Sequence, residues 1–130
     1  RAHVFPFGLG DRDGGFPMGD FETDGASFLK SERWCKERQR QSGEGQMRDM
    51  YDFVRRERIR QIDLALVNVE GYEYELIPYM LADGIKPVRL VYQSHPQVGS
   101  DDETLRGTLT AQRYRLLWDY GLVLSAWECT

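Results

Sequence analysis

Two polar segments that follow apolar runs carry side chains able to move protons. Glu70 comes just after the run Leu64 to Val67, and His95 comes just after Val88 to Tyr92. An imidazole titrates near neutral pH and can accept the proton of a hydroxyl group, so His95 is the candidate general base. Glu70 is the second catalytic candidate, because its carboxylate can orient a substrate or cofactor. Two plainer readings stay open: His95 hydrogen-bonded to a neighbouring loop, and Glu70 capping the N-terminus of a helix.

A third segment, Gly8-Leu9-Gly10-Asp11, also follows a short apolar stretch. In open α/β sheets, ligands bind outside the carboxyl ends of the strands, where these three segments would lie. Asp and Gly also tolerate positive φ, so Gly8 to Gly14 can be a plain turn. Both interpretations are kept.

The elements that must position these residues are predicted from spacing and turn chemistry. Met47, Met50, Tyr51 and Val54 recur at helical spacing, and Ile62 to Val69 is apolar on both faces over its middle. The predicted elements begin with a strand over His3 to Leu9, a hairpin or irregular stretch over 16 to 30, and an exposed helical turn and loop over Ser31 to Gly45. A helix over Gln46 to Arg58 and a strand over Ile62 to Val69 follow, and then a helix through Tyr74, Ile77 and Leu81 that is kinked or broken at Pro78. The last elements are a strand over Val88 to Tyr92, a helix from Ser100 to Tyr120, and a strand over Leu122 to Trp127.

These elements alternate, and the alternation predicts an α/β domain with a mostly parallel sheet flanked by helices. Its central strand, Ile62 to Val69, is expected to be covered by helices on both faces. In the last predicted helix, Tyr114, Leu117 and Trp118 form the inward face, and Gly121 is the residue after its end.

Composition and charge limit the classes of partner that the chain can bind. The chain has 130 residues, 41% of them apolar and 29% charged, with a formal net charge of −4, which argues against nucleic acid. The basic run Arg55 to Arg60 is interpreted as a solvated helix end, and no segment is long and apolar enough to span a membrane. Cys35 and Cys129 are predicted to be free buried thiols, which favours a reducing, cytoplasmic setting without fixing the compartment. Two histidines make a zinc site an unfavoured reading.

Ile62-Asp63-Leu64-Ala65-Leu66-Val67-Asn68-Val69-Glu70-Gly71-Tyr72-Glu73-Tyr74-Glu75 resembles the I-D-L-L-K-I-D-V-E-G-A-E-x-E segment of FkbM-type S-adenosylmethionine-dependent methyltransferases. Phe7 to Gly14 is similar to the family's A-L-G-D-x-x-G turn, and Tyr114 to Trp127 to its closing helix and strand. The approach helix and a second strand ending in a histidine come in the family's order. The resemblance covers about residue 4 to residue 127.

The resemblance implies one partial domain over 1–130, with the Rossmann-like class I methyltransferase fold but without its N-terminal strands and glycine-rich loop. The first residue is Arg1, so we expect the natural N-terminus to lie upstream. The implied cofactor is S-adenosylmethionine, with Gly8 and Leu9 near its adenine, Asp11 close by, and Asn68 at the strand end. Glu73 and Glu75 are expected to be solvated helix charges.

Three residues depart from the family pattern at the expected reaction centre. Leu66 and Asn68 stand where the family typically has Lys and Asp, and Gln93 stands where it often has an acid. An amide makes hydrogen bonds but supplies neither negative charge nor a base. The implied function is O-methylation of a hydroxyl on a small molecule or glycan. The alternatives are a non-catalytic relative that serves as a binding module, and another nucleotide-binding α/β protein such as a flavodoxin-like domain.

The resemblance also predicts self-association. In the family's sheet the fourth strand lies between the first and the fifth, so a fourth strand over residues 62 to 69 would lack its neighbour on one side. An apolar edge of this kind recruits another strand. We expect the chain to aggregate, to dimerise through that edge, or to place Val4 to Leu9 beside it.

Overall fold

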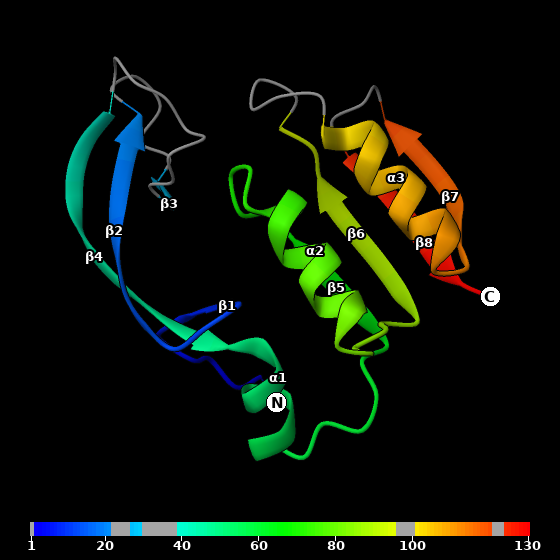
Figure 1. Ribbon diagram of the computed structural model, residues 1–130, viewed down its shortest axis with the longest axis horizontal. Helices are drawn as coiled ribbons and strands as arrows, with labels where there is room; N and C mark the ends of the chain where they lie inside the picture. Colours follow the sequence, from blue (N-terminus) through cyan, green and yellow to red (C-terminus); the bar gives the residue numbers. More distant parts are fainter. Residues whose placement is uncertain (1, 22–26, 30–38, 96–100, 121–123) are drawn as a thin grey trace. The chain divides into compact units, whose positions relative to one another are not determined.

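The computed structural model describes every residue except 1, 22–26, 30–38, 96–100 and 121–123 (Figure 1). The chain divides into two compact units, Arg1–Arg58 and Ile59–Thr130. Each contains one mixed four-stranded sheet, and the described residues form three helices in all. The α/β class predicted from the sequence is therefore confirmed. The mostly parallel sheet is not observed, because antiparallel pairs predominate in both units.

The first unit is built around a long antiparallel pair. Its strands are β1 (Gly8–Gly10), β2 (Gly14–Phe21), β3 (Ser27–Leu29) and β4 (Gln39–Asp49), in the spatial order β1-β4-β2-β3, followed by α1 (Met50–Arg56). The hairpin expected within residues 16 to 30 is present as the antiparallel β2–β3 pair. The first strand begins later than predicted, since only Gly8–Gly10 pairs, in parallel with β4.

The helix predicted over Gln46 to Arg58 begins four residues too early. Met47 belongs to β4, where it pairs with Gly8 and Gly14, while α1 starts at Met50. Asp49 is the N-cap, and its carboxylate accepts a hydrogen bond from the Asp52 amide at 2.9 Å. Both methionines are buried, one from a strand and one from a helix, so their spacing imitated a single helix face. The helical turn and loop expected over Ser31 to Gly45 are not observed from Gln39 onward, because these residues belong to β4. Residues 31–38 lie outside the described part of the chain.

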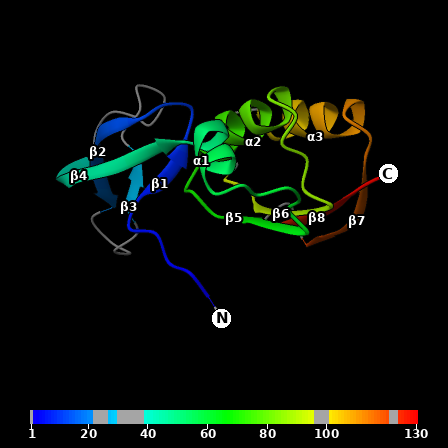
Figure 2. The ribbon, with the colours of Figure 1, turned by 90° about the horizontal axis from the view of Figure 1, so that it is seen from below.

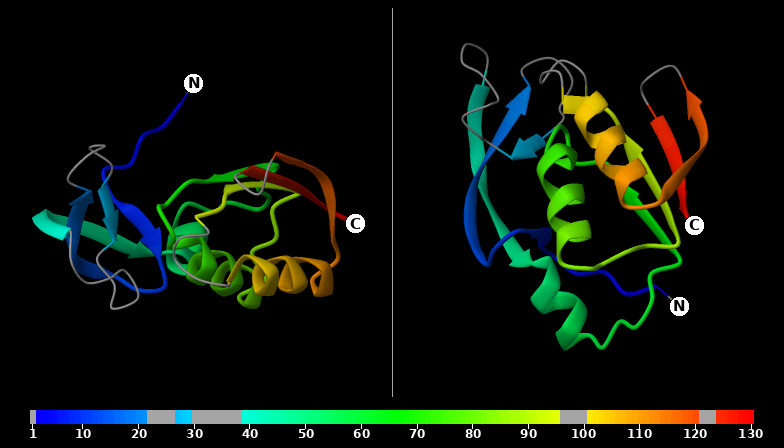
Figure 3. Two further views of the ribbon diagram at one scale, coloured as in Figure 1. Left: turned by 90° about the horizontal axis from the view of Figure 1, so that it is seen from above. Right: turned by 45° about the vertical axis from the view of Figure 1, so that its right-hand side comes forward.

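The second unit carries the predicted catalytic residues. It contains β5 (Leu64–Val67), α2 (Glu73–Ala82), β6 (Arg89–Gln93), α3 (Asp101–Ala111), β7 (Tyr114–Tyr120) and β8 (Leu124–Cys129). Its sheet has the order β5-β6-β8-β7, in which β5 and β6 are parallel and β8 is antiparallel to both neighbours. Both helices cover the same face of this sheet (Figures 2 and 3). Leu90, Tyr92 and Trp127 are buried beneath them.

Strand β5 lies at the edge of its sheet. Among the described residues it pairs only with β6, and the side chains of Leu64 and Leu66 are 59% and 71% exposed. The expectation of a central strand covered by helices on both faces is therefore wrong within this unit, because β5 is an edge strand and α2 and α3 lie on one face of its sheet. In the first unit, β1 pairs with β4 over Gly8–Gly10.

The helix predicted from Ser100 to Tyr120 is in fact a helix followed by a strand. Helix α3 ends at Ala111, and Arg113 has φ 66°, the left-handed conformation that often ends a helix. Leu117 and Trp118 are 42% and 47% exposed on β7 rather than on an inward helix face, whereas Tyr114 is buried. A glycine more often takes the left-handed position, so Arg113 is not recognisable as a helix stop from its residue type. Ser100 and Gly121 lie outside the described residues.

Two further expectations concern α2 and the membrane. Helix α2 runs as one element of ten residues through Pro78, not as two short turns. No helix in the described part of the chain has the length and apolarity needed to cross a membrane.

Candidate functional site

The carboxyl ends of parallel strands β5 and β6 bring Glu70 and His95 together. The Nε2 atom of His95 lies 3.3 Å from Oε2 of Glu70. Two residues in the left-handed region, Glu70 with φ 50° and Gly71 with φ 102°, turn the chain after β5. Such a conformation is costly for a glutamate and acceptable for a glycine. The turn aims the Glu70 carboxylate at the imidazole, so the two predicted catalytic residues share one site.

A third residue, Glu73, completes this cluster. Its Oε1 lies 2.8 Å from Nδ1 of His95, and its Oε2 accepts a hydrogen bond from the Gly71 amide at 2.7 Å. Glu73 is fully buried and His95 is 7% exposed. The expectation that Glu73 is a solvated helix charge is therefore wrong, while Glu75 is exposed as expected. Glu73 lies in the first turn of α2, where its carboxylate contacts the His95 ring at the end of β6.

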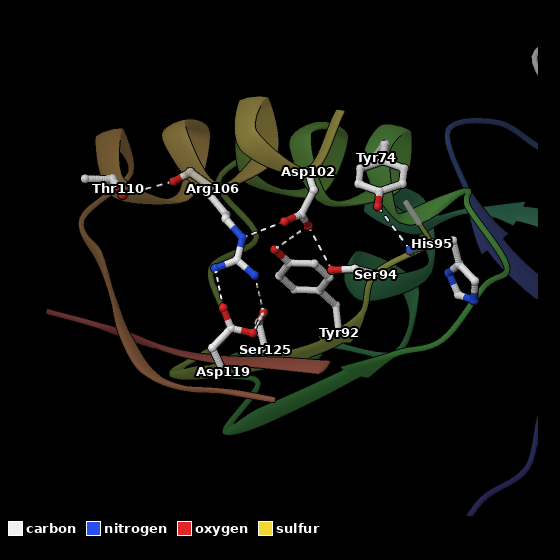
Figure 4. A network of polar contacts seen from close by, with 9 residues as sticks. All are labelled: Tyr74, Tyr92, Ser94, His95, Asp102, Arg106, Thr110, Asp119 and Ser125. Atoms are coloured by element: carbon white, nitrogen blue, oxygen red, sulfur yellow. Dashed lines mark hydrogen bonds and ion pairs between the residues drawn. The ribbon is translucent and has the colours of Figure 1, made fainter. Parts of the chain in front are cut away.

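The backbone of His95 is also held. Its amide donates to the hydroxyl of Tyr74 at 3.0 Å (Figure 4). Burial raises the pKa of Tyr74 to about 12, so this hydroxyl keeps its proton at neutral pH. His95 is thus fixed by its ring through Glu73 and by its main chain through Tyr74.

The charges around His95 favour its protonated form. The hydrogen bond to Glu73 raises the pKa of His95 above its ordinary value, burial works against this, and the negative charges of Glu73 and Glu70 add to the increase. The Nε2 atom is buried and has no hydrogen-bond partner of good geometry, although Glu70 lies within ion-pair distance. The imidazole thus has a carboxylate near each of its two nitrogens.

The plainer readings of these residues can now be compared with the structure. Residue Tyr72 is the N-cap of α2 and makes no side-chain capping bond. Glu73, rather than Glu70, accepts the amide hydrogen bond at the start of the helix. His95 bonds to Glu73 at the first turn of α2, and its backbone bonds to Tyr74 on the same helix.

A second polar group lies beside the end of β6 and was not predicted. Arg106 on α3 donates to Asp102 at 2.6 Å, to Asp119 at 2.8 Å and to the hydroxyl of Ser125 at 2.9 Å. Burial lowers the pKa of Arg106, but the hydrogen bonds to Asp119 and Asp102 outweigh this and leave it above its ordinary value. The i, i+4 spacing of Asp102 and Arg106 was the one sequence signal available. Asp119 and Ser125 come from different strands, so their part depended on tertiary structure.

The predicted cofactor residues are placed in separate units. Gly8, Leu9 and Asp11 belong to β1 and the bend that follows it, whereas Asn68 is exposed just after β5. The first unit has a cavity of about 290 Å³, but none of these residues lines it. Its walls come from the N-terminal segment, the bend after β1, the end of β4 and α1, namely Phe5, Phe7, Asp13, Arg48, Asp49, Asp52, Phe53, Arg56 and Glu57.

The remaining sequence predictions concern metals and thiols. In the part of the chain that the structure describes, no group of three or more His, Cys, Asp or Glu side chains is placed to hold a metal ion. Cys129 is a free, partly buried thiol as predicted, and Cys35 lies outside the described residues. Arg55 and Arg56 occupy the last turn of α1, as the basic run suggested.

Comparison with known proteins adds no relative. No protein-family model, no curated protein and no solved structure matches this chain.

Proposed function

We propose that this chain is the carboxyl-terminal part of an S-adenosylmethionine-dependent methyltransferase of the FkbM type, which methylates a hydroxyl group of a small molecule or glycan. The observation that carries the proposal is the cluster of Glu70, His95 and Glu73 at the ends of two adjacent parallel strands. In α/β enzymes the ligand binds at the carboxyl edge of the sheet, and the proposed base lies at that edge. The order β5, α2, β6 also follows the family's segment order.

His95 would accept the proton of the acceptor hydroxyl. Because Nδ1 is held by Glu73, the nitrogen left for this step is Nε2. Transfer of the proton to Nε2 leaves an imidazolium between two carboxylates, which stabilise it. The oxygen would then form its new bond to the methyl carbon while the carbon–sulfur bond breaks, and the sulfur would leave with that electron pair as a neutral thioether. A positioned base of this kind contributes about 10²–10⁴-fold to a rate.

The cofactor would supply an electrophilic methyl group on a positively charged sulfur. A carboxylate near that charge favours its binding, and Glu70 is the acidic side chain at the site with partial solvent access, 26% exposed. Glu70 therefore fits a role beside the sulfonium. Asn68, which is exposed at the same strand end, can donate and accept hydrogen bonds there.

The test is methyl transfer by the natural full-length protein from radiolabelled S-adenosylmethionine to a panel of hydroxyl compounds. We expect His95→Asn to lower kcat by about 10²–10⁴-fold. His3→Asn is the matched control, since His3 is an exposed histidine of the first unit, and it should keep full activity. The base must be neutral to act, so kcat/KM should rise as pH increases through the raised pKa of His95. A pH profile that His95→Asn leaves unchanged would contradict the assignment.

A non-catalytic binding module is the second candidate, and one observation favours it. The Glu73 carboxylate already binds both the Gly71 amide and the His95 ring, and it closes the end of β6 onto the start of α2. These two hydrogen bonds of Glu73 stabilise the fold whether or not the protein catalyses a reaction. Calorimetry with S-adenosylmethionine and with its demethylated product separates the two candidates, because heat from neither ligand would favour the module.

A further inference from the structure

Hydrogen bonds from two helices hold the main chain around His95 (Figure 4). On α3, Asp102 accepts hydrogen bonds from the hydroxyl of Ser94 at 2.8 Å and from that of Tyr92 at 3.2 Å. Ser94 directly precedes His95 in the sequence. On α2, Tyr74 accepts the hydrogen bond of the His95 amide at 3.0 Å.

The direction of both bonds is fixed by the groups that make them. A carboxylate and the oxygen of a hydroxyl accept, so Ser94 donates to Asp102 and the His95 amide donates to Tyr74. The first bond holds the side chain just before His95, and the second holds the main chain of His95 itself.

Asp102 is itself held in place on α3. Its other oxygen accepts from Arg106 at 2.6 Å, which supplies the counter-charge and ties Asp102 to β7 and β8 through Asp119 and Ser125. The side chain of Asp102 is 18% exposed. Residues of β7 and β8 thus help to hold Arg106 beside Asp102.

We propose that Asp102 is a positioning residue for His95, acting through the hydroxyl of Ser94, the residue directly before it. By holding the His95 backbone, it keeps Nδ1 within hydrogen-bond distance of Glu73. Loss of the anchor would let the ring move away from Glu73, and the pKa of His95 would fall toward that of a free imidazole. The catalytic consequence rests on the proposed methyl transfer, but the geometric consequence does not.

The test is NMR titration of the histidine Cε1–H signals, with amide exchange of His95 measured on the same samples. The protein has two histidines, so His3 serves as an internal reference. We expect Asp102→Asn and Ser94→Ala to lower the pKa of His95 and to speed exchange of its amide by at least about tenfold. Thr108→Ala is the matched control, because it removes a hydroxyl on the same helix as Asp102 that bonds to the Thr104 carbonyl and not to this network, and it should change neither quantity.

Ser94→Ala keeps the pairing of Asp102 with Arg106, so it remains informative if Asp102→Asn does not fold. The inference is overturned if a folded Ser94→Ala protein has the wild-type His95 pKa and amide exchange. Activity is a separate readout, in which kcat should fall by up to about 10²-fold at unchanged KM. A wild-type protein without methyl transfer but with the expected NMR changes would refute the proposed function and leave Asp102 as the residue that positions His95.

Discussion

The buried pair of His95 and Glu73 makes the stability of the unit Ile59–Thr130 depend on pH. The two side chains lie 2.8 Å apart, with His95 7% exposed and Glu73 fully buried. The hydrogen bond to Glu73 raises the pKa of His95 above its value in an unfolded chain. The folded state therefore binds the proton more tightly. This contribution to stability is complete below about pH 6.5 and is lost as pH rises through the folded-state pKa.

The size of the effect follows from the release of one proton. Between the unfolded and the folded pKa of one group, the free energy of unfolding falls by about 1.4 kcal/mol per pH unit. Urea unfolding at a series of pH values, followed by the fluorescence of the buried Trp127, measures this slope directly. The decline should begin near pH 6.5, about the pKa of an unfolded histidine, and level off above the folded-state value.

Glu73→Gln tests the cause of the slope. The amide keeps the shape of the side chain but removes the charge that holds the imidazolium, so the slope should flatten. At pH values where His95 is protonated, the substitution should cost about 1.5–3 kcal/mol, the range for a hydrogen bond to a charged group. Glu75→Gln, two residues along the same helix and exposed, should change stability by less than about 0.5 kcal/mol. A wild-type stability that stays level across the window, or a slope that survives in Glu73→Gln, would refute the reasoning.

Three further predictions concern packing and association. Arg106→Met should destabilise the second unit by about 2–4 kcal/mol in urea titrations, because two partly buried carboxylates lose their counter-charge. Arg56→Met breaks one exposed ion pair and should cost less than about 1 kcal/mol, so equal costs for the two substitutions would contradict this reasoning. Leu66→Lys, at a 71% exposed position on the edge strand, should lower the self-association measured by analytical ultracentrifugation, and an unchanged sedimentation profile would exclude this edge as the contact. Gly10→Ala should cost about 1–3 kcal/mol by thermal unfolding, because its Cβ would overlap the sulfur of the buried Met47. Gly15→Ala, whose nearest contact lies at 3.7 Å, should be tolerated.

The sequence predicted the parts of the site that depend on local order. Glu70 and His95 each follow a parallel strand, and the carboxyl ends of adjacent parallel strands necessarily meet at one edge of the sheet. The apolar runs before them made those strands recognisable. The position of Asn68 at the same edge follows for the same reason.

The missed features depend on contacts between distant residues. The burial of Glu73 is set by the docking of α2 against the end of β6, which no local pattern reports. The strand β7 was predicted as helix because Tyr114, Leu117 and Trp118 have helical spacing, while a bulge between Leu116 and Trp118 shifts the alternation of the strand. The stop at Arg113 lacks the usual glycine. Propensity and spacing are weak guides wherever tertiary pairing decides the conformation.

The backbone at Glu70 helps to decide between a structural and a chemical role for its side chain. A left-handed conformation costs about 1–2 kcal/mol for a residue with a Cβ, and a glycine or asparagine would adopt it more easily. Glu70 makes no capping bond to α2 that would offset this cost, because the Gly71 amide is bound by Glu73. The contact that the strained backbone secures is the one between its carboxylate and Nε2 of His95. Strain that is retained for a single polar contact is typical of functional sites, and here it favours Glu70 as a working partner of His95 over a residue that only ends a strand.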